Sequence, residues 1–327
     1  MDRDGTIDGE ERLADRLRTL LGARHPRAAV AVVTKDETAT ASVGTHLGSD
    51  FEIGSISKGV TGLLYADAIA RGEVTAGTAL GELLPLRGTA VGAATLGALS
   101  THRSGLPSLP AAAQPYRRTL ALYRHGTNPY GEDVGQLLDQ ARNVRLGRPR
   151  PRYSNLGFEL LGHSLAAAAG TSYAALLGDR VARPLGLDVC YTPGTPAELR
   201  PEALVGTSAR GRPREPWTGE AIAPAGGIRA TVGSMGRLMA ALLDGTAPGI
   251  GALDPVATFR AGARVGAGWV TVEVKGRGVT WHNGGTGGFR SWLGLDRDAG
   301  TGVVILSATS VSVDRHGFAL LAEQGER

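Results

Sequence analysis

A serine and a lysine three residues apart, Ser55 and Lys58, carry the clearest chemical signal in the sequence. They stand at the start of a predicted helix, where residues i and i+3 share one face, so Oγ and Nζ can meet. A serine hydroxyl needs a neighbouring base to become an effective nucleophile, and a partly buried lysine can serve because desolvation lowers its pKa. Only three lysines occur in 327 residues, so a chance S-x-x-K is uncommon. The alternative is a surface lysine beside a helix-capping serine.

A second motif, Tyr153-Ser154-Asn155, opens another predicted helix. A tyrosine near cationic groups can accept a proton because those charges stabilise its phenolate. The Asn155 amide can hold a substrate carbonyl and the lysine together. The alternative is a helix-capping Ser154 with Tyr153 packed beside it.

A third motif is the glycine-rich run from Trp281 to Phe289, WHNGGTGGF, between two predicted strands. Glycines let a substrate approach the backbone closely. A free N–H here and the N–H of Ser55 could together form an oxyanion hole. A phosphate-binding loop is the competing interpretation, but the run lacks the G-K-[ST] ending and does not open a helix.

Hydrophobic spacing predicts the elements that must position these motifs. Helices are expected over 10–23, 57–71, 157–169, 173–182, 233–243 and 313–323. Strands are expected over 27–34, 38–44, 265–274, 278–282, 291–296 and 302–308. The proline-bearing stretches 107–129 and 193–216 are expected to be irregular.

Strands near both ends of the chain with helices between them predict an α+β fold. We expect residues 1–57 and 220–327 to form a discontinuous lobe, in which helices flank an antiparallel sheet, and residues 58–219 to form an inserted, mostly helical lobe. The active site is expected in the cleft between the lobes, because ligand sites favour such places.

Composition argues against several other functions. The net charge is +4 and the pI about 9.4, but the arginines are spread along the chain and no RNA-binding or zinc-finger pattern accompanies them, so no nucleic-acid partner is expected. One cysteine, Cys190, allows no internal disulfide and is expected to be a packing residue. The seven histidines lack metal-ligand spacing, so we expect no metal and no cofactor. Of these, His102 and His163 are expected to pack or cap.

The acidic N-terminus lacks the apolar core of a secretory signal, and no run of about 18 apolar residues occurs. We therefore expect a cytoplasmic protein without a membrane partner. The sequence does not predict its oligomeric state.

In this order and on these elements, the three motifs resemble those of the serine β-lactamase and penicillin-binding-protein superfamily. The chain is most similar to the branch that contains class C β-lactamases, D-alanyl-D-alanine carboxypeptidases and carboxylesterases. The segments that carry this resemblance are FEIGSISK, LGALSTHRSGLP, YSNLGFELLG, AGGIRATVGSMGRLMAALLDG and HNGGTGGFRSWLGLD. It extends from about residue 10 to 325 and implies the β-lactamase/transpeptidase-like fold.

The resemblance implies that Ser55 is the nucleophile and that Lys58 and Tyr153 share general-base and general-acid duty. It implies substrate contacts for a set of four residues, namely Asn155, His282, Asn283 and Gly284. The N–H groups of Ser55 and Gly285 would form the oxyanion hole.

This sequence departs from the family's K-T-G pattern, because His282 replaces the lysine and Asn283 the threonine. A mostly neutral imidazole holds a carboxylate less well than lysine does. We therefore expect acyl transfer from an ester or amide through an acyl-Ser55 intermediate, most simply by an intracellular esterase or amidase. The alternatives are a transacylase with an amine or alcohol acceptor, a D-Ala-D-Ala-type peptidase or weak β-lactamase, and a non-catalytic ligand-binding relative.

Overall fold

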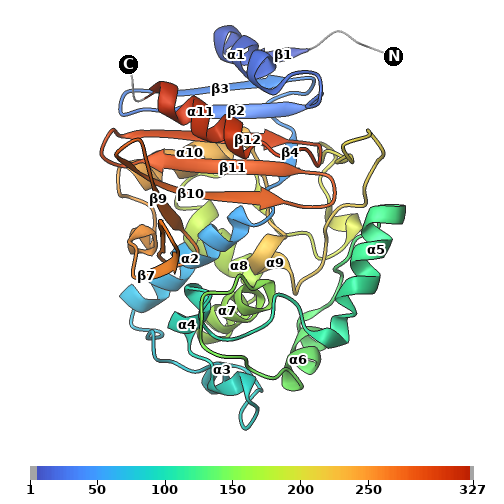
Figure 1. Ribbon diagram of the computed structural model, residues 1–327, viewed down its shortest axis with the longest axis vertical. Helices are drawn as coiled ribbons and strands as arrows, with labels where there is room; N and C mark the ends of the chain where they lie inside the picture. Colours follow the sequence, from blue (N-terminus) through green and yellow to red (C-terminus); the bar gives the residue numbers. More distant parts are fainter. Residues whose placement is uncertain (1–5, 325–327) are drawn as a thin grey trace.

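The computed structural model describes residues 6–324, and within them an antiparallel sheet of nine strands forms the centre of the fold (Figure 1). The strands follow one another across the sheet in the order β1 (Ile7–Gly9), β3 (Thr38–Val43), β2 (Ala28–Val33), β12 (Thr301–Ser307), β11 (Arg290–Asp296), β10 (Arg277–Gly285), β9 (Val270–Val274), β8 (Ala263–Val265) and β7 (Ala257–Arg260). The two ends of the chain therefore meet where β2 pairs with β12.

Helices cover both faces of this sheet. On one face, α1 (Glu11–Leu21) and α11 (Asp314–Gln324) enclose a core around the fully buried Trp292. On the other face lie α10 (Val232–Leu243) and α2 (Ile56–Ala70), and α2 carries the S-x-x-K motif at its start.

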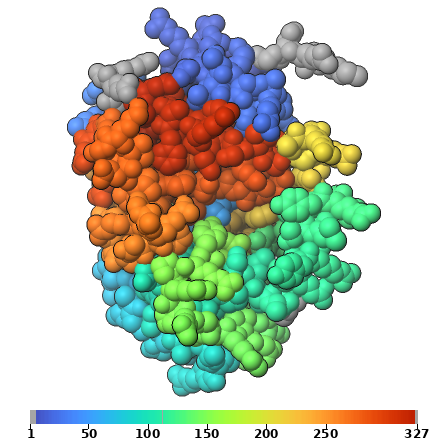
Figure 2. Space-filling model, in the orientation of Figure 1, coloured from blue at the N-terminus to red at the C-terminus, as the bar shows by residue number. Residues whose placement is uncertain are grey.

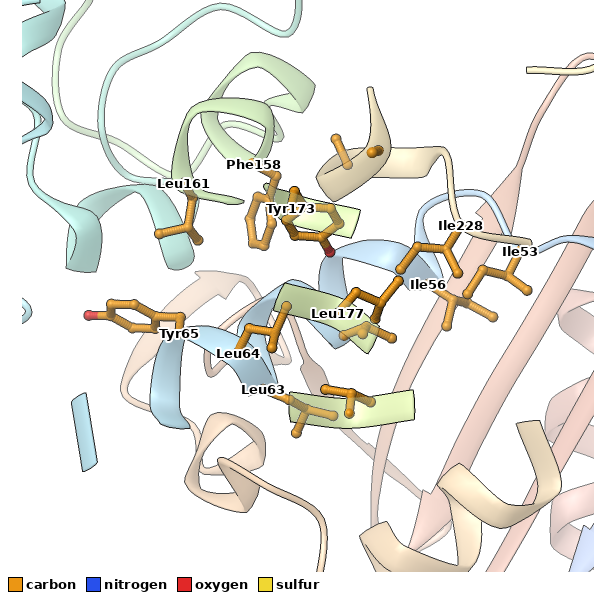
Figure 3. Packing of buried hydrophobic residues seen from close by; sticks show 14 of the residues in the cluster. Ile53, Ile56, Leu63, Leu64, Tyr65, Phe158, Leu161, Tyr173, Leu177 and Ile228 are labelled. Carbon is orange, nitrogen blue, oxygen red and sulfur yellow. The ribbon is translucent and has the colours of Figure 1, made fainter. Parts of the chain in front are cut away.

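The middle of the chain supplies the remaining helices, which occupy the lower part of Figure 1. They are α3 (Leu80–Leu83), α4 (Leu96–Ser100), α5 (Pro115–His125), α6 (Val134–Arg142), α7 (Asn155–Ala168), α8 (Tyr173–Leu177) and α9 (Ala223–Gly226). In Figure 3, Leu64 of α2 and Phe158 of α7 belong to the hydrophobic cluster that joins these helices to the sheet. The packing is thus continuous across the two parts of the fold.

A small second sheet lies beside the first, in the order β4 (Asp50–Glu52), β6 (Arg229–Thr231) and β5 (Cys190–Tyr191). It sets the direction in which the chain enters Ser55, because β4 ends three residues before it. Cys190 is partly buried, and burial raises the pKa of its thiol to about 12, which fits packing rather than nucleophilic chemistry.

The predicted α+β class and the antiparallel sheet with flanking helices are confirmed. The single strand expected over 265–274 is wrong: Gly266–Trp269 form a turn between β8 and β9. The irregular stretch expected over 107–129 is also partly wrong, because it contains α5. No residue of α5 is buried, although Tyr116, Leu120 and Tyr123 follow one another at helical spacing. Over 173–182, α8 continues into a π-helical turn, Gly178–Ala182.

The lobe boundaries at 57/58 and 219/220 stay predictions, and residues 1–5 and 325–327 of the discontinuous lobe lie outside the described residues. Within residues 6–324, no single helix is long and apolar enough to cross a bilayer. One helix pair reaches that length and composition together, α7 with Tyr173–Ala182, and it bends by 80° between its two parts.

Candidate active site

The structure brings Ser55 and Lys58 together, as their spacing predicts. Ser55 is the N-cap of α2, and Lys58 Nζ lies 3.1 Å from its Oγ. The first N–H groups of a helix have no intrahelical acceptor, so the Ser55 N–H is not used by α2. The hydroxyl, its candidate base and a free donor therefore occupy one helix turn.

Lys58 is fully buried, and this gives its amine the properties of a base. Nζ donates to Ser55 Oγ and, at 2.5 Å, to the carbonyl oxygen of Ala225 in α9. Burial lowers the pKa of Lys58 to about 7, and the carboxylate of Glu159 opposes this shift. At neutral pH a large fraction of the amine is thus free of its extra proton and can accept one from Ser55.

Tyr153 stands over this pair from the loop before α7. Lys58 Nζ lies 4.8 Å from the centre of its ring, and the hydroxyl interacts with Ser55. The residue is 37% exposed, but burial around the hydroxyl raises its pKa above the ordinary tyrosine value, and the Ser55 contact offsets only part of that rise. Tyr153 is therefore a phenol in the free protein, suited to give a proton rather than to take one.

His102 supports Tyr153 from behind. The centres of the two rings lie 4.6 Å apart, and the ring of Phe158 in α7 lies 4.8 Å from the imidazole. His102 Nδ1 accepts the Ser154 N–H at 3.2 Å, so in the neutral ring the proton is on Nε2. Burial and the charge of Lys58 hold the pKa of His102 well below its usual range. The expected packing role fits this neutral, enclosed ring.

Asn155 begins α7, and its side chain makes a contact that the motif alone does not show. Its Nδ2 donates to the hydroxyl of Tyr130 at 3.0 Å. Tyr130 packs against Trp217, with ring centres 4.7 Å apart. A wall of Asn155, Tyr130 and Trp217 thus borders the site on the helical side.

The glycines of the third motif lie inside β10, where the chain passes Ser55 at close range. A Cβ on Gly284 would stand 2.0 Å from the carbonyl oxygen of Ile53, so a side chain there would displace the strand. Gly285 pairs with Arg290 of β11, and the next residue, Thr286, donates its N–H to the Phe289 carbonyl. Hydrogen-bonded and non-hydrogen-bonded pairs alternate in antiparallel strands, so Thr286 and Phe289 form a bonded pair and Gly285 and Arg290 a non-bonded one. The Gly285 N–H therefore points away from β11, and on its other side β9 does not extend this far.

His282 and Asn283 sit side by side on β10 and point to different partners. His282 is buried, and its Nδ1 donates to the Asn283 carbonyl at 2.6 Å, which leaves Nε2 as an acceptor. Burial and the nearby Lys58 lower the pKa of His282 to about 4, so the ring is neutral at pH 7. Asn283 Nδ2 donates to Asp314 at the start of α11. A pocket of about 270 Å³ lies between β10 and the helical side, and Tyr153, His282 and Asn283 are among the residues that line it.

A network of buried ion pairs holds the strand β4, which leads to Ser55, in place. Arg229 of β6 has no exposed surface and binds Asp50 at 2.6 Å and Glu52 at 3.1 Å. Glu52 also accepts the Trp217 N–H at 2.9 Å and interacts with Thr286. The network therefore ties β4 to the loop after β10 and to Trp217.

The residues expected to act in catalysis or to form the oxyanion hole lie, with His282 and Gly284, around the Ser55 hydroxyl or the adjoining end of β10. Asn155 starts the neighbouring helix, and its side chain contacts Tyr130. The structure leaves Asn283 beside the pocket with its side-chain amide engaged elsewhere. Sequence reasoning missed Tyr130, Trp217, Glu159 and the support given by His102. The segments containing His102 and Glu159 were part of the resemblance, but no motif marked Tyr130 or Trp217. Among the described residues, no group of three or more His, Cys, Asp and Glu side chains is placed to hold a metal.

In Figure 2 the surface is hollowed between the orange strands and the green helical part, with blue atoms from the region of α2 at its floor. The folded chain thus has an open cleft above a serine–lysine–tyrosine cluster. Residues 13–325 match the Beta-lactamase family, and the chain belongs to this family.

Similar proteins agree with this assignment. The D-alanyl-D-alanine-carboxypeptidase/endopeptidase AmpH of Escherichia coli strain K12 is 29% identical over 160 residues, which are 46% of this chain and 39% of that protein. The chain thus aligns with well under half the length of this relative. Class C β-lactamase from Rhodobacter sphaeroides is similar in structure, with TM-score 0.77, 21% identity and coverage of 96% of this chain and 97% of its own. A β-lactamase from Sulfitobacter sp. EE-36 has TM-score 0.78, 19% identity and coverage of 96% of both chains. These two structures show that the fold is shared.

Proposed function

We propose that the protein is an esterase or amidase that forms an acyl-enzyme on Ser55. The observation that carries this proposal is the fully buried Lys58 amine, 3.1 Å from Ser55 Oγ and with a pKa of about 7. A general base with a pKa near the working pH is the most effective kind.

In the acylation step, Ser55 Oγ attacks the substrate carbonyl carbon and its proton moves to Lys58 Nζ. The carbonyl oxygen becomes an oxyanion that the Ser55 and Gly285 N–H groups stabilise. When the bond to the leaving group breaks, the Tyr153 hydroxyl gives that group a proton and recovers one from Lys58. Water then attacks the acyl-Ser55 carbonyl by the reverse proton path and releases the acid.

The neutral His282 supports an uncharged ester or amide over a substrate held by its carboxylate. A cation at this position would attract a carboxylate, whereas an imidazole with a pKa of about 4 offers only an acceptor on Nε2 at pH 7. The alternative function is that of a D-Ala-D-Ala-type peptidase or weak β-lactamase. The partial match to AmpH supports this alternative.

A fluorophosphonate probe tests the proposal. It should label the native protein once, on Ser55, and Ser55→Ala should abolish labelling and lower ester turnover by at least ~10³-fold. Ser57→Ala is the matched control, because Ser57 Oγ accepts the Ile228 N–H and does not face the site. Labelling of Ser55→Ala, or modification mapped to Ser57, would contradict the assignment.

Transfer to an amine or alcohol is the alternative end of the cycle. We propose that the stretches 106–129 and 191–217 border the acceptor site, because Tyr123 and Arg214 of these stretches lie beside Thr286 at the end of β10. Partitioning separates the two outcomes: Ser55 is acylated with a simple ester, and millimolar amines or alcohols are added. Acid as the sole product with every acceptor would support hydrolysis, and a saturable switch to amide or ester would support a transacylase, since a bound acceptor can reach an effective molarity of ~10⁵ M or more.

A further inference from the structure

A second cavity, of about 230 Å³, lies on the helical side of the cleft between α5, α6 and α7. Its lining is mostly apolar, with Leu109, Leu122 and Leu137 among the contributing residues. Tyr130 and Trp217, the two aromatic members of the wall described above, also face it. Because Asn155 donates to Tyr130, this cavity and the catalytic site share one wall.

The cavity contains one carboxylate that nothing in the described part of the chain satisfies. Glu159 of α7 is 4% exposed, and none of the hydrogen bonds or ion pairs formed within residues 6–324 includes its side chain. Its carboxyl group is not among the fully enclosed polar atoms without partners, so its remaining exposed surface faces the cavity that it lines. A buried polar group in a native protein normally has a partner.

The other charged groups of the cavity are already paired. Glu132 accepts hydrogen bonds from Arg118 and, at 3.0 Å, from Gln140 Nε2. Arg118 also donates to the Pro129 carbonyl at 3.0 Å. Glu159 is therefore left with unused acceptor capacity, and a ligand that fills this need must bring a hydrogen-bond donor.

A cationic donor fits this lining better than a neutral one. The faces of tyrosine and tryptophan rings attract cations, and Tyr130 and Trp217 supply both rings. Burial raises the pKa of Glu159 to about 8, with Glu132 adding to the rise and Lys58 opposing it. A bound ammonium would offset the cost of the buried negative charge and favour the ionised carboxylate.

We propose that this cavity is a subsite for an ammonium group on the acyl part of the substrate, with Glu159 as its counter-ion and Tyr130 and Trp217 beside it. The acyl chain would run from Ser55 past Asn155 into the cavity. The path of the acyl chain rests on the proposed function. The binding of a cation beside Glu159 does not depend on acyl transfer.

The first test compares matched esters. The probes are p-nitrophenyl 6-aminohexanoate and 8-aminooctanoate, each paired with the p-nitrophenyl alkanoate in which CH₃ replaces NH₃⁺. The native protein should have the higher kcat/KM for the ammonium member of at least one pair. Glu159→Gln should lower that preference at least about tenfold, the scale of one hydrogen bond to a charged group. Any effect of Glu159 on Lys58 cancels in the ratio, since both esters are acylated by the same base.

Thr119→Val is the matched control, because Thr119 lines the same cavity and carries no charge. It should change both members of a pair by the same factor. A native protein that prefers the alkyl ester of each pair, or a Glu159→Gln variant that keeps the native preference, would overturn the proposal.

A binding measurement separates this inference from the proposed function. The Ser55→Ala protein, titrated calorimetrically with n-hexylammonium and with 1-hexanol, should bind the cation more tightly, and Glu159→Gln in that background should remove the difference. Equal affinities would overturn the subsite even if the fluorophosphonate labels Ser55. Tighter binding of the cation would sustain the subsite even if Ser55 resists labelling.

Discussion

Gly54 lies directly against Gly285: a Cβ atom on Gly54 would stand 2.6 Å from the Gly285 nitrogen. Gly54 also has φ +51°, a conformation that favours glycine. The residue before the candidate nucleophile thus allows the two N–H groups of the proposed oxyanion hole to approach each other.

Gly54→Ala should therefore lower the rate of Ser55 acylation by about 10²-fold, the effect of displacing reacting groups by about 1 Å. The measurement is the rate of fluorophosphonate labelling, with circular dichroism to check folding. Gly233→Ala in α10 is the control, because a Cβ there meets nothing within 4 Å. An unchanged labelling rate in Gly54→Ala would mean that the spacing of these two N–H groups does not limit acylation.

Lys58→Ala and Tyr153→Phe should each slow acylation. The double variant should acylate only slightly more slowly than the less active of the two single variants. Residues that act as one proton-transfer unit give non-additive losses. Pre-steady-state acylation by a chromogenic ester measures all three variants. Losses that multiply would show that the two side chains act independently.

Acylation should rise with pH and level off above about 7, because Lys58 must lose its proton before it can accept the one from Ser55. Glu159→Gln should move the midpoint of kcat/KM downward, since the carboxylate raises the pKa of Lys58. The profile is best recorded with a neutral ester from pH 5 to 9. A midpoint near the ordinary lysine value would contradict the proposed base.

The same pKa shift predicts how stability depends on pH. The pKa of Lys58 is about 7 in the folded chain against 10.5 for an ordinary lysine, so between these values the unfolded chain binds more protons. Stability then rises with pH by up to about 1.4 kcal/mol per unit. Compared with Lys58→Met, the native protein should gain stability from pH 8.5 to 10, a range above the pKa of Glu159. Urea denaturation measures the difference, and parallel curves for the two proteins would refute a buried, uncharged amine.

His282→Lys should leave fluorophosphonate labelling of Ser55 largely intact and should shift ester selectivity toward substrates that carry a carboxylate. The physical reason is that the native ring is neutral at pH 7, with a pKa of about 4, while a lysine adds a positive charge. The measurement is the kcat/KM ratio for a carboxylate-bearing ester and its methyl ester. Loss of labelling would place His282 in the base machinery instead.

The sequence by itself determined the parts of the site whose geometry is local. Ser55 and Lys58 meet because three residues separate them on one helix, and Asn155 follows Tyr153 at the start of another. The main helices and most strands followed from apolar spacing for the same reason. The turn that divides 265–274 was missed because its residues are apolar or glycine. Helix α5 was missed because the prolines around it indicated an irregular segment, whereas Pro115 stands at the first helical position, where proline is tolerated.

Only the tertiary structure decided the relations between residues far apart in the chain. The pKa of Lys58 depends on burial by α9 and on Glu159, about 100 residues away. The direction of the Gly285 N–H depends on its register with Arg290, and the partner of Asn283 is on α11. Glu159 looks in the sequence like any other helical glutamate. Its burial without a partner results from the packing of α5, α6 and α7 around one cavity, because desolvation depends on all surrounding atoms and not on neighbours in the chain.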